Sequence, residues 1–135
     1  MSESDAPEQP EQESKPIGRI EWLDLTVADA SRMRDFYTAV VGWKSSDVPM
    51  GSYSDFCMNL PDDNTTVAGV CHARGTNANL PSQWLVYVRV ADVTSSAAEC
   101  EKRGGKILDG PRRMAGSNFC VIQDLAGAVM ALMSD

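Results

Sequence analysis

Two stretches of this chain decide how it folds, because the second repeats the first. They are residues 22–29, WLDLTVAD, and residues 84–92, WLVYVRVAD. At an offset of 63 residues, Val27-Ala28-Asp29 recurs as Val90-Ala91-Asp92, and Gly42 recurs as Gly105. In each stretch, alternating side chains predict a strand with two different faces. The sequence therefore predicts two copies of one unit, and units too small to bury their own apolar face pack on each other.

The same offset aligns residues in the later part of each copy. Ser54, Phe56 and Cys57 align with Ser117, Phe119 and Cys120, and Ala68 aligns with Ala131. On this alignment, Cys57 and Cys120 lie on matching strands and share the same environment. The matches are those expected of a central strand and a last strand in two copies of one motif.

Each repeated strand leads into a predicted helix. Asp29 suits an N-cap, and apolar residues at 33, 36, 37, 40 and 41 have helical spacing before Gly42 ends the helix. Asp92 caps a second helix that is predicted to run through Arg103. Further strands are predicted at 43–48, 53–60 and 65–71, then at 106–108, 118–123 and 128–133, with Gly110-Pro111 interrupting the strand that begins at 106. Each copy thus has the order βαβββ.

The domain organisation follows from this order. Residues 17–134 are predicted to form a single α+β domain from two βαβββ modules, 17–72 and 83–134, joined by a polar linker at 73–82. Residues 1–16 are rich in Glu, Pro, Gln and Ser and are expected to be a disordered acidic tail. The groove between two packed modules is the natural place for a ligand.

Composition excludes several classes of function. The net charge of −7 argues against nucleic acid as a partner, because phosphate contacts need clustered Lys and Arg, and Arg112-Arg113 is too small a cluster. No apolar run reaches the length of a membrane span, and no secretory signal is evident. We therefore expect a cytoplasmic protein whose four cysteines are reduced.

The ordered motifs of the two halves resemble those of the vicinal oxygen chelate superfamily, which includes glyoxalases, bleomycin resistance proteins and dioxygenases. The motifs are the two strands above with Phe36-Tyr37, Gly42-Trp43, Gly104-Gly105-Lys106, Gly110-Pro111 and Asp124-Leu125-Ala126-Gly127. The resemblance implies a half-barrel mixed sheet around a small molecule, with the helices on its outer face. It also implies a homodimer.

Enzymes of this superfamily hold a divalent metal with His, Gln or Glu from the first and last strands of each module. The resemblance carries these four places onto Trp22, Ala68, Leu85 and Ala131. None of these side chains binds a metal, and neighbouring positions on the last strands are also apolar. We therefore expect no metal site of the usual kind and no other cofactor.

Strand alternation nominates the residues that line the groove. Its expected ligand-binding residues are Trp22, Asp24, Thr26, His72, Leu85, Tyr87, Arg89 and Met130. Trp22 and Tyr87 either stack on a flat ligand or fill the core. Met58, Met114, Met130 and Met133 either form an adaptable lining or belong to the core.

The ionisable residues of this set can each be interpreted in two ways. Asp24 and Arg89 either form a pair that joins the modules or receive a ligand together, with the Arg binding an anion or carbonyl. His72 is either a general base at the rim of the groove or a solvent-facing residue at the end of a strand.

Three functions remain open. The first is a metal-independent module that binds a small apolar or aromatic molecule in a pocket containing Trp22, Tyr87 and Met130. The second is an unconventional lyase, isomerase or dioxygenase-like enzyme that uses Asp24, His72 or Arg89, with at least one strongly shifted pKa. The third is an interaction protein whose groove is filled by its own side chains.

Overall fold

The computed structural model describes residues 16–135. The predicted acidic tail falls almost wholly outside this range. The first half contains β1 (Ile20–Val27), α1 (Ala30–Val41), β2 (Lys44–Pro49), β3 (Ser54–Asn59) and β4 (Thr66–His72). After a 3-10 turn, η2 (Gly75–Asn77), the second half contains β5 (Trp84–Arg89), α2 (Val93–Lys102), β6 (Lys106–Met114), β7 (Ser117–Gln123) and β8 (Val129–Ser134). The predicted α+β order is confirmed.

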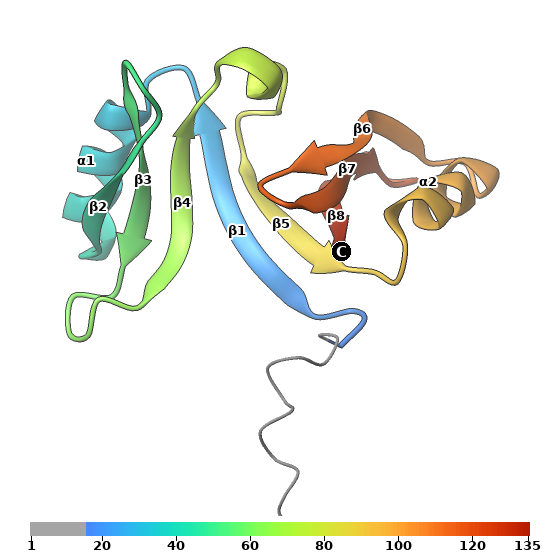
Figure 1. The fold of residues 1–135 in the computed structure, drawn as a ribbon, viewed down its shortest axis with the longest axis horizontal. Coiled ribbons are helices and arrows are strands. Elements are labelled where there is room, and N and C mark those ends of the chain that lie inside the picture. Colours follow the sequence, from blue (N-terminus) through green and yellow to red (C-terminus); the bar gives the residue numbers. More distant parts are fainter. Residues whose placement is uncertain (1–15) are drawn as a thin grey trace, which may run out of the picture.

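All eight strands form one sheet in the order β2-β3-β4-β1-β5-β8-β7-β6. The modules meet where β1 runs antiparallel to β5, with Trp22 opposite Tyr87. Within each module the first strand runs parallel to the last, β1 beside β4 and β5 beside β8. The sheet curves without closing, and both helices lie on its outer side (Figure 1). This is the predicted half-barrel.

Local signals at the helix ends act as the sequence predicts. The Asp29 carboxylate accepts a hydrogen bond from the backbone N–H of Arg32, and Asp92 accepts one from Thr94. Gly42 ends α1 in the left-handed conformation, with φ of 93°, and its N–H bonds to the carbonyl of Thr38. These caps fix where each helix begins and where α1 ends.

The two faces of the sheet have different partners. On the convex face, α1 covers a cluster that includes Phe56, Met58 and Val70, and α2 covers one that includes Cys120 and Leu132. On the concave face, Leu85, Tyr87 and Phe119 form a third cluster with Trp22 packed against it. The expected division of β1 and β5 into a helix-facing side and a groove-facing side is confirmed.

The repeat is less regular at the later strands than the 63-residue offset implies. Asp24 lies opposite Gly69, whereas Tyr87, its counterpart at that offset, lies opposite Ala131. Gly69 and Ala131 are therefore equivalent, at an offset of 62. A shift of one residue exchanges the faces of a strand, so Ala68 lies under α1 whereas Ala131 lies in the concave cluster.

The residues aligned at the 63-residue offset on the third strand of each module also lie on opposite faces of the sheet. Phe56 packs under α1, but Phe119 belongs to the concave cluster. Cys120 is buried on the convex face, whereas Cys57 pairs with Gly69 and shares its concave side. The expectation that Cys57 and Cys120 share one environment is therefore wrong.

The strand that begins at Lys106 is longer than predicted. Gly110-Pro111 does not end it, because β6 continues to Met114 with two register shifts against β7. Gly110 has φ of 82°, and a Cβ there would lie 2.6 Å from the carbonyl oxygen of Phe119. Glycine therefore lets the bulged strand stay close to its neighbour. Among residues 16–135, no helix is long and apolar enough to cross a membrane.

Candidate pocket on the concave face

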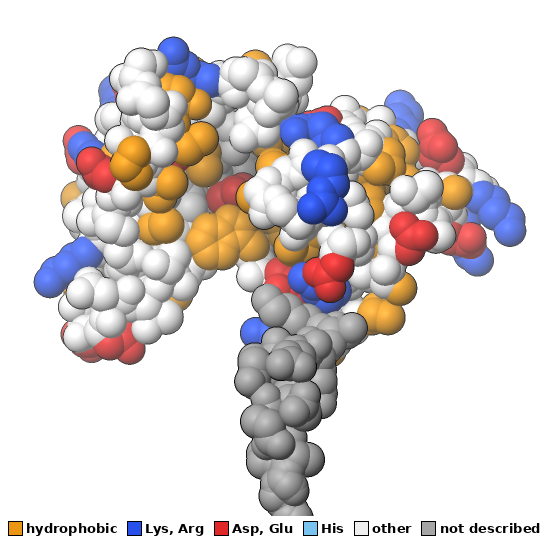
Figure 2. Space-filling model, in the orientation of Figure 1, with side chains coloured by type: hydrophobic (Ala, Val, Ile, Leu, Met, Phe, Trp, Pro, Cys, Tyr) orange, Lys and Arg blue, Asp and Glu red, His pale blue; other side chains and the backbone are white. Residues whose placement is uncertain are grey.

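A cavity of about 660 Å³ opens on the concave face of the sheet, and both modules line it. In the space-filling view, hydrophobic side chains gather in the hollow between the two halves (Figure 2). The lining residues are Trp22, Asp24, Met50, Cys71, Thr76, Asn77, Tyr87, Arg112, Arg113, Met114, Ala115, Ser117, Phe119 and Met133. A groove filled by the protein's own side chains, the third expectation, does not fit this cavity.

Aromatic rings and thioethers provide most of the apolar lining. The rings of Tyr87 and Phe119 stack with their centroids 6.0 Å apart. Met114 and Met133 pack against the same cluster. Flat rings and flexible thioethers together suit a flat apolar molecule.

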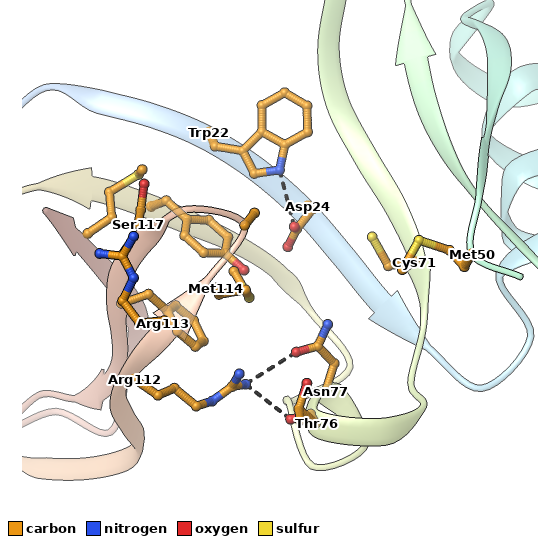
Figure 3. A pocket seen from close by; sticks show the side chains of 14 residues that line it. Trp22, Asp24, Met50, Cys71, Thr76, Asn77, Arg112, Arg113, Met114 and Ser117 are labelled. Carbon is orange, nitrogen blue, oxygen red and sulfur yellow. Dashed lines mark hydrogen bonds between the residues drawn. The ribbon is translucent and has the colours of Figure 1, made fainter. Parts of the chain in front are cut away.

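Asp24 contributes the carboxylate of this pocket. The residue is only 8% exposed, and its Oδ2 accepts a hydrogen bond from Trp22 Nε1 at 3.1 Å (Figure 3). The other oxygen, Oδ1, is buried and has no hydrogen-bond partner among the described residues. A buried acceptor without a partner is costly, so a hydrogen-bond donor that reached Oδ1 would relieve this cost.

Burial sets the acid–base character of Asp24. It raises the pKa of the carboxyl to about 6, interactions with Trp22 and Tyr87 oppose the rise, and the nearby Asp55 charge adds to it. Burial also raises the pKa of the Cys71 thiol to about 12 and raises the pKa of the Tyr87 hydroxyl. At neutral pH, Asp24 thus lies close to its titration point, whereas Cys71 and Tyr87 stay neutral.

Gly69 positions the indole of Trp22. It lies opposite Asp24 on the neighbouring strand, and a Cβ at this position would be 3.1 Å from Trp22 Cζ2 and 3.3 Å from Asp24 Cβ. The indole therefore lies against the bare backbone of β4. This close approach lets Trp22 Nε1 reach the carboxylate.

Arg112 connects β6 to the turn between the modules. Its guanidinium forms two hydrogen bonds with the Asp109 carboxylate, at 2.8 and 2.9 Å, and donates to the carbonyl of Thr76 and to Asn77 Oδ1 (Figure 3). It also lies 4.7 Å from the centroid of the Phe119 ring. Arg112 thus holds one wall of the pocket, and Asp109 neutralises its charge.

Arg113 lies at the mouth of the pocket beside Ser117 (Figure 3). Its side chain is exposed and donates to the carbonyl of Gly116 at 2.7 Å and to Asn118 Oδ1 at 3.4 Å. Both acceptors are neutral, and no carboxylate within residues 16–135 forms an ion pair with it.

Three of the predicted site residues line the cavity, namely Trp22, Asp24 and Tyr87. Leu85 and Thr26 have the expected strand parity, but both are buried and neither lines the cavity. Leu85 lies in the cluster behind Tyr87. The alternation therefore found the correct face, although the pocket occupies only part of it.

Arg89 does not pair with Asp24, which corrects the first interpretation of these two residues. Its guanidinium lies 3.3 Å from Glu21 Oε2 and 3.1 Å from Asp135 Oδ1. A register shift between Ile20 and Trp22 accompanies this arrangement. Arg89 thus lies at the far end of β5, outside the pocket.

His72 is also placed differently from its predicted position at the groove. It alternates with Cys71, which lines the pocket, and therefore shares the face of Val70 beneath α1. Its Nδ1 lies 3.3 Å from Asp55 Oδ1, and its ring meets the edge of Tyr53. The expected role of His72 as a base at the groove has no support in this geometry.

Met130 does not line the pocket, so its predicted placement is corrected. It lies opposite Ile122 on the convex face and is 37% exposed. Of the four methionines considered, Met114 and Met133 line the cavity and Met58 lies beneath α1.

Sequence reasoning missed the wall that the second half of the molecule provides. Thr76 and Asn77 lie in the segment predicted to be a plain linker, and Arg112, Arg113 and Ser117 flank the β6–β7 turn. The one available signal was the Arg112-Arg113 pair, the nearest approach to a basic cluster in an acidic chain.

The positions that the resemblance assigns to a metal do not offer a fitting donor set. The groove-facing residues there are Trp22, Gly69, Leu85 and Ala131, with Gly69 in place of Ala68 after the register correction. Their side chains carry no oxygen, sulfur or imidazole donor. Within residues 16–135, no group of three or more His, Cys, Asp or Glu is arranged to hold a metal ion.

Solved structures of other proteins have the same fold, and some of them contain a ligand. Methylmalonyl-CoA epimerase of Streptomyces coelicolor, in complex with 2-nitronate-propionyl-CoA, has a TM-score of 0.50 at 20% identity, over 87% of this chain and 97% of that one. A hypothetical protein of Bacillus halodurans has a TM-score of 0.51 at 10% identity, over 87% and 94%. At these identities the likeness shows the fold alone.

Curated relatives share more sequence but are longer. The protein named "Putative glyoxylase CFP32" in Mycobacterium bovis and Mycobacterium tuberculosis is 27% identical over 92 residues, which cover 67% of this chain and 35% of the relative. This chain spans about a third of the length of those relatives. The family model for the Glyoxalase/Bleomycin resistance protein/Dioxygenase superfamily matches residues 19–132. The chain therefore belongs to the glyoxalase, bleomycin resistance protein and dioxygenase superfamily.

Proposed function

We propose that the concave pocket binds a small molecule with a flat apolar or aromatic body, without a metal held at the positions usual for the family. The observation that carries this proposal is a mostly apolar cavity of about 660 Å³ with one buried carboxylate oxygen, at Asp24, that has no hydrogen-bond partner among the described residues. This volume lies in the range of small-molecule sites, which are mostly apolar with a few placed polar groups. The aromatic side chains of Trp22, Tyr87 and Phe119 are part of its wall.

A neutral dye tests this proposal without knowledge of the natural ligand. N-phenyl-1-naphthylamine brightens in apolar sites and is small enough to enter the cavity. We expect it to bind the full chain, and we expect Met114→Trp, which puts a bulkier side chain into the cavity, to weaken binding at least tenfold. Leu108→Trp is the matched control, since Leu108 lies on the same strand but is exposed and outside the pocket. No dye binding, or equal loss in both variants, would contradict the proposal.

A second function is favoured by the acid–base character of Asp24. A carboxyl whose pKa is raised to about 6 can take up and return a proton near neutral pH. We therefore also propose an acid–base enzyme of the lyase or isomerase class in which Asp24 moves the proton. The name of the epimerase with the same fold makes methylmalonyl-CoA the first thioester to test.

The experiment for this second function is solvent exchange. The chain is incubated with methylmalonyl-CoA in D2O, and loss of the proton signal beside the thioester is followed by NMR. We expect exchange with the wild-type chain, loss of exchange in Asp24→Asn, and full exchange in Asp62→Asn, a turn residue outside the pocket. If the wild-type chain gave no exchange between pH 5 and 8, proton transfer by Asp24 on this thioester would be contradicted.

We further propose that the chain forms a homodimer. The outer face of α1 exposes Phe36, Val40 and Val41, each at least 52% exposed, and burying such a face on a second copy would remove it from water. Sedimentation equilibrium of the full chain is expected to give twice the chain mass. A monomer at 100 μM would exclude this assembly, and Val40→Glu is expected to dissociate the dimer.

A further inference from the structure

We infer that the ligand of this pocket carries an anionic group, which Arg113 binds at the mouth. The inference deepens the proposed function and rests on it, because it names the class of molecule that the same pocket takes. On this inference, Arg113 selects ligands by charge, whereas the apolar walls select them by size and shape alone.

The charge state of Arg113 is the first step of the argument. Among residues 16–135, its guanidinium donates only to neutral acceptors, the carbonyl of Gly116 and the side chain of Asn118. Arg112, its neighbour, forms a two-point pair with Asp109. In a chain of net charge −7, an arginine at a pocket mouth without an ion-pair partner among the described carboxylates is therefore a positive charge in excess.

The buried end of the pocket has the opposite sign. Asp24 lies against Trp22 and carries the unpartnered oxygen Oδ1. An anionic group placed there would meet a carboxylate of like charge in a poorly hydrated site, which is unfavourable. The pocket is thus polarised, and the anion of a ligand belongs at the Arg113 end. Guanidinium groups suit carboxylates, sulfonates and phosphates because they bind two oxygens at once.

Most of the remaining lining surface is apolar. The stacked rings of Tyr87 and Phe119, together with Met114 and Met133, line the pocket in addition to these two charged groups. This combination of cation, apolar walls and buried acceptor fits an anion attached to a flat apolar body. Carboxylic, sulfonic and phosphoric acids of aromatic compounds share this chemistry.

A pair of dyes that differ in one group provides the test. 1-Anilinonaphthalene-8-sulfonate carries a sulfonate that N-phenyl-1-naphthylamine lacks, and the two share their rings and N–H. We expect Arg113→Gln to weaken binding of the sulfonate dye about fivefold and to leave the neutral dye unchanged. Arg113→Lys should restore part of the loss. Arg32→Gln, on the outer helix, removes the same charge far from the pocket and should change neither affinity.

The outcomes separate this inference from the function on which it rests. If the neutral dye binds and Met114→Trp blocks it, but Arg113→Gln leaves the sulfonate dye unaffected, the anionic ligand is excluded and the pocket proposal stands. Equal weakening of both dyes in Arg113→Gln would make Arg113 a wall residue and also overturn the inference. If the neutral dye fails to bind the wild-type chain, the proposed function fails and the inference fails with it.

Discussion

At the scale of single residues, Asp24 links the fold to its proposed use. Burial raises the pKa of its carboxyl from 3.8 to about 6. Between these two pH values the folded chain binds more protons than the unfolded chain, so the free energy of unfolding falls as pH rises through the window. A difference of about 2 pKa units corresponds to about 3 kcal/mol. At neutral pH, the buried carboxylate therefore lowers the free energy of unfolding.

Asp24→Asn should remove the destabilisation that the buried carboxylate causes at neutral pH. We expect the variant to be more stable than the wild type at pH 8, by about 1–3 kcal/mol, and to lose stability less steeply between pH 4 and 6. Urea unfolding at several pH values measures both effects. Asp62→Asn serves as the exposed control. A variant with the wild-type pH slope would show that another group titrates in this window.

Gly69→Ala should raise the pKa of Asp24 further. The new Cβ, 3.1 Å from Trp22 Cζ2, forces the indole to shift and weakens its hydrogen bond to Oδ2, which opposes the rise in pKa. We expect a loss of stability of about 1 kcal/mol. An NMR titration of the Asp24 carboxyl carbon measures the pKa. Trp22→Phe removes the same hydrogen bond and should shift the pKa in the same direction; a fall in either variant would contradict this account.

Alternation along β1 and β5 was enough to identify Trp22, Asp24 and Tyr87 as pocket residues. It failed for Arg89, because the pairing of Arg89 with Glu21 and Asp135 depends on a local register shift and on the C-terminal residue. The alternation of side chains along a strand carries no information about either feature. The unpartnered state of Asp24 Oδ1 likewise depends on three-dimensional neighbours that no pattern encodes.

At the scale of elements, Arg112 determines how β6 meets the turn at Gly75–Asn77. Arg112→Met keeps much of the apolar stem but loses the bonds to Asp109, Thr76 and Asn77. We expect about threefold weaker binding of the neutral dye and a loss of stability of about 1–2 kcal/mol, since a charge-assisted pair is broken. Dye titration and urea unfolding measure these effects. Unchanged dye affinity would show that the turn does not need this contact.

The end of α1 provides a prediction on stability alone. Gly42 has φ of 93°, and no atom lies within 4 Å of a Cβ built there. Gly42→Ala therefore costs only the strain of the left-handed conformation, about 1 kcal/mol. Urea unfolding should show this loss, while dye affinity should stay the same. A loss of dye affinity would show that α1 also shapes the pocket.

Element type and order followed from caps, periodicity and turn residues, because these signals are local. The registers of β4 and β8 did not, because identities such as Ala68 with Ala131 favour an offset that the strand pairing does not keep. A one-residue difference exchanges the faces of a strand. It therefore moved His72 from the predicted groove to the convex face. Met130 was misplaced for a different reason, because it alternates with Ala131, which does face the groove.

At the scale of the whole molecule, the pocket exists because two modules share one sheet. β1 and β4 supply Trp22, Asp24 and Cys71, and the second module supplies the opposite wall with Arg113 at its edge. The repeat predicted this groove between modules. The sequence could not predict that the segment at 73–82 would add Thr76 and Asn77 to it, since a polar loop carries no signal of where it folds back.

The most direct test uses the three tryptophans as reporters. Trp22 lines the pocket, whereas Trp43 and Trp84 pack beneath α1 on the other face. In a ¹H–¹⁵N NMR titration with N-phenyl-1-naphthylamine, with the Trp22 indole signal assigned by Trp22→Phe, we expect that signal to shift strongly and the other two to stay in place. Shifts confined to Trp43 or Trp84, or no shift at all, would contradict a ligand site on the concave face.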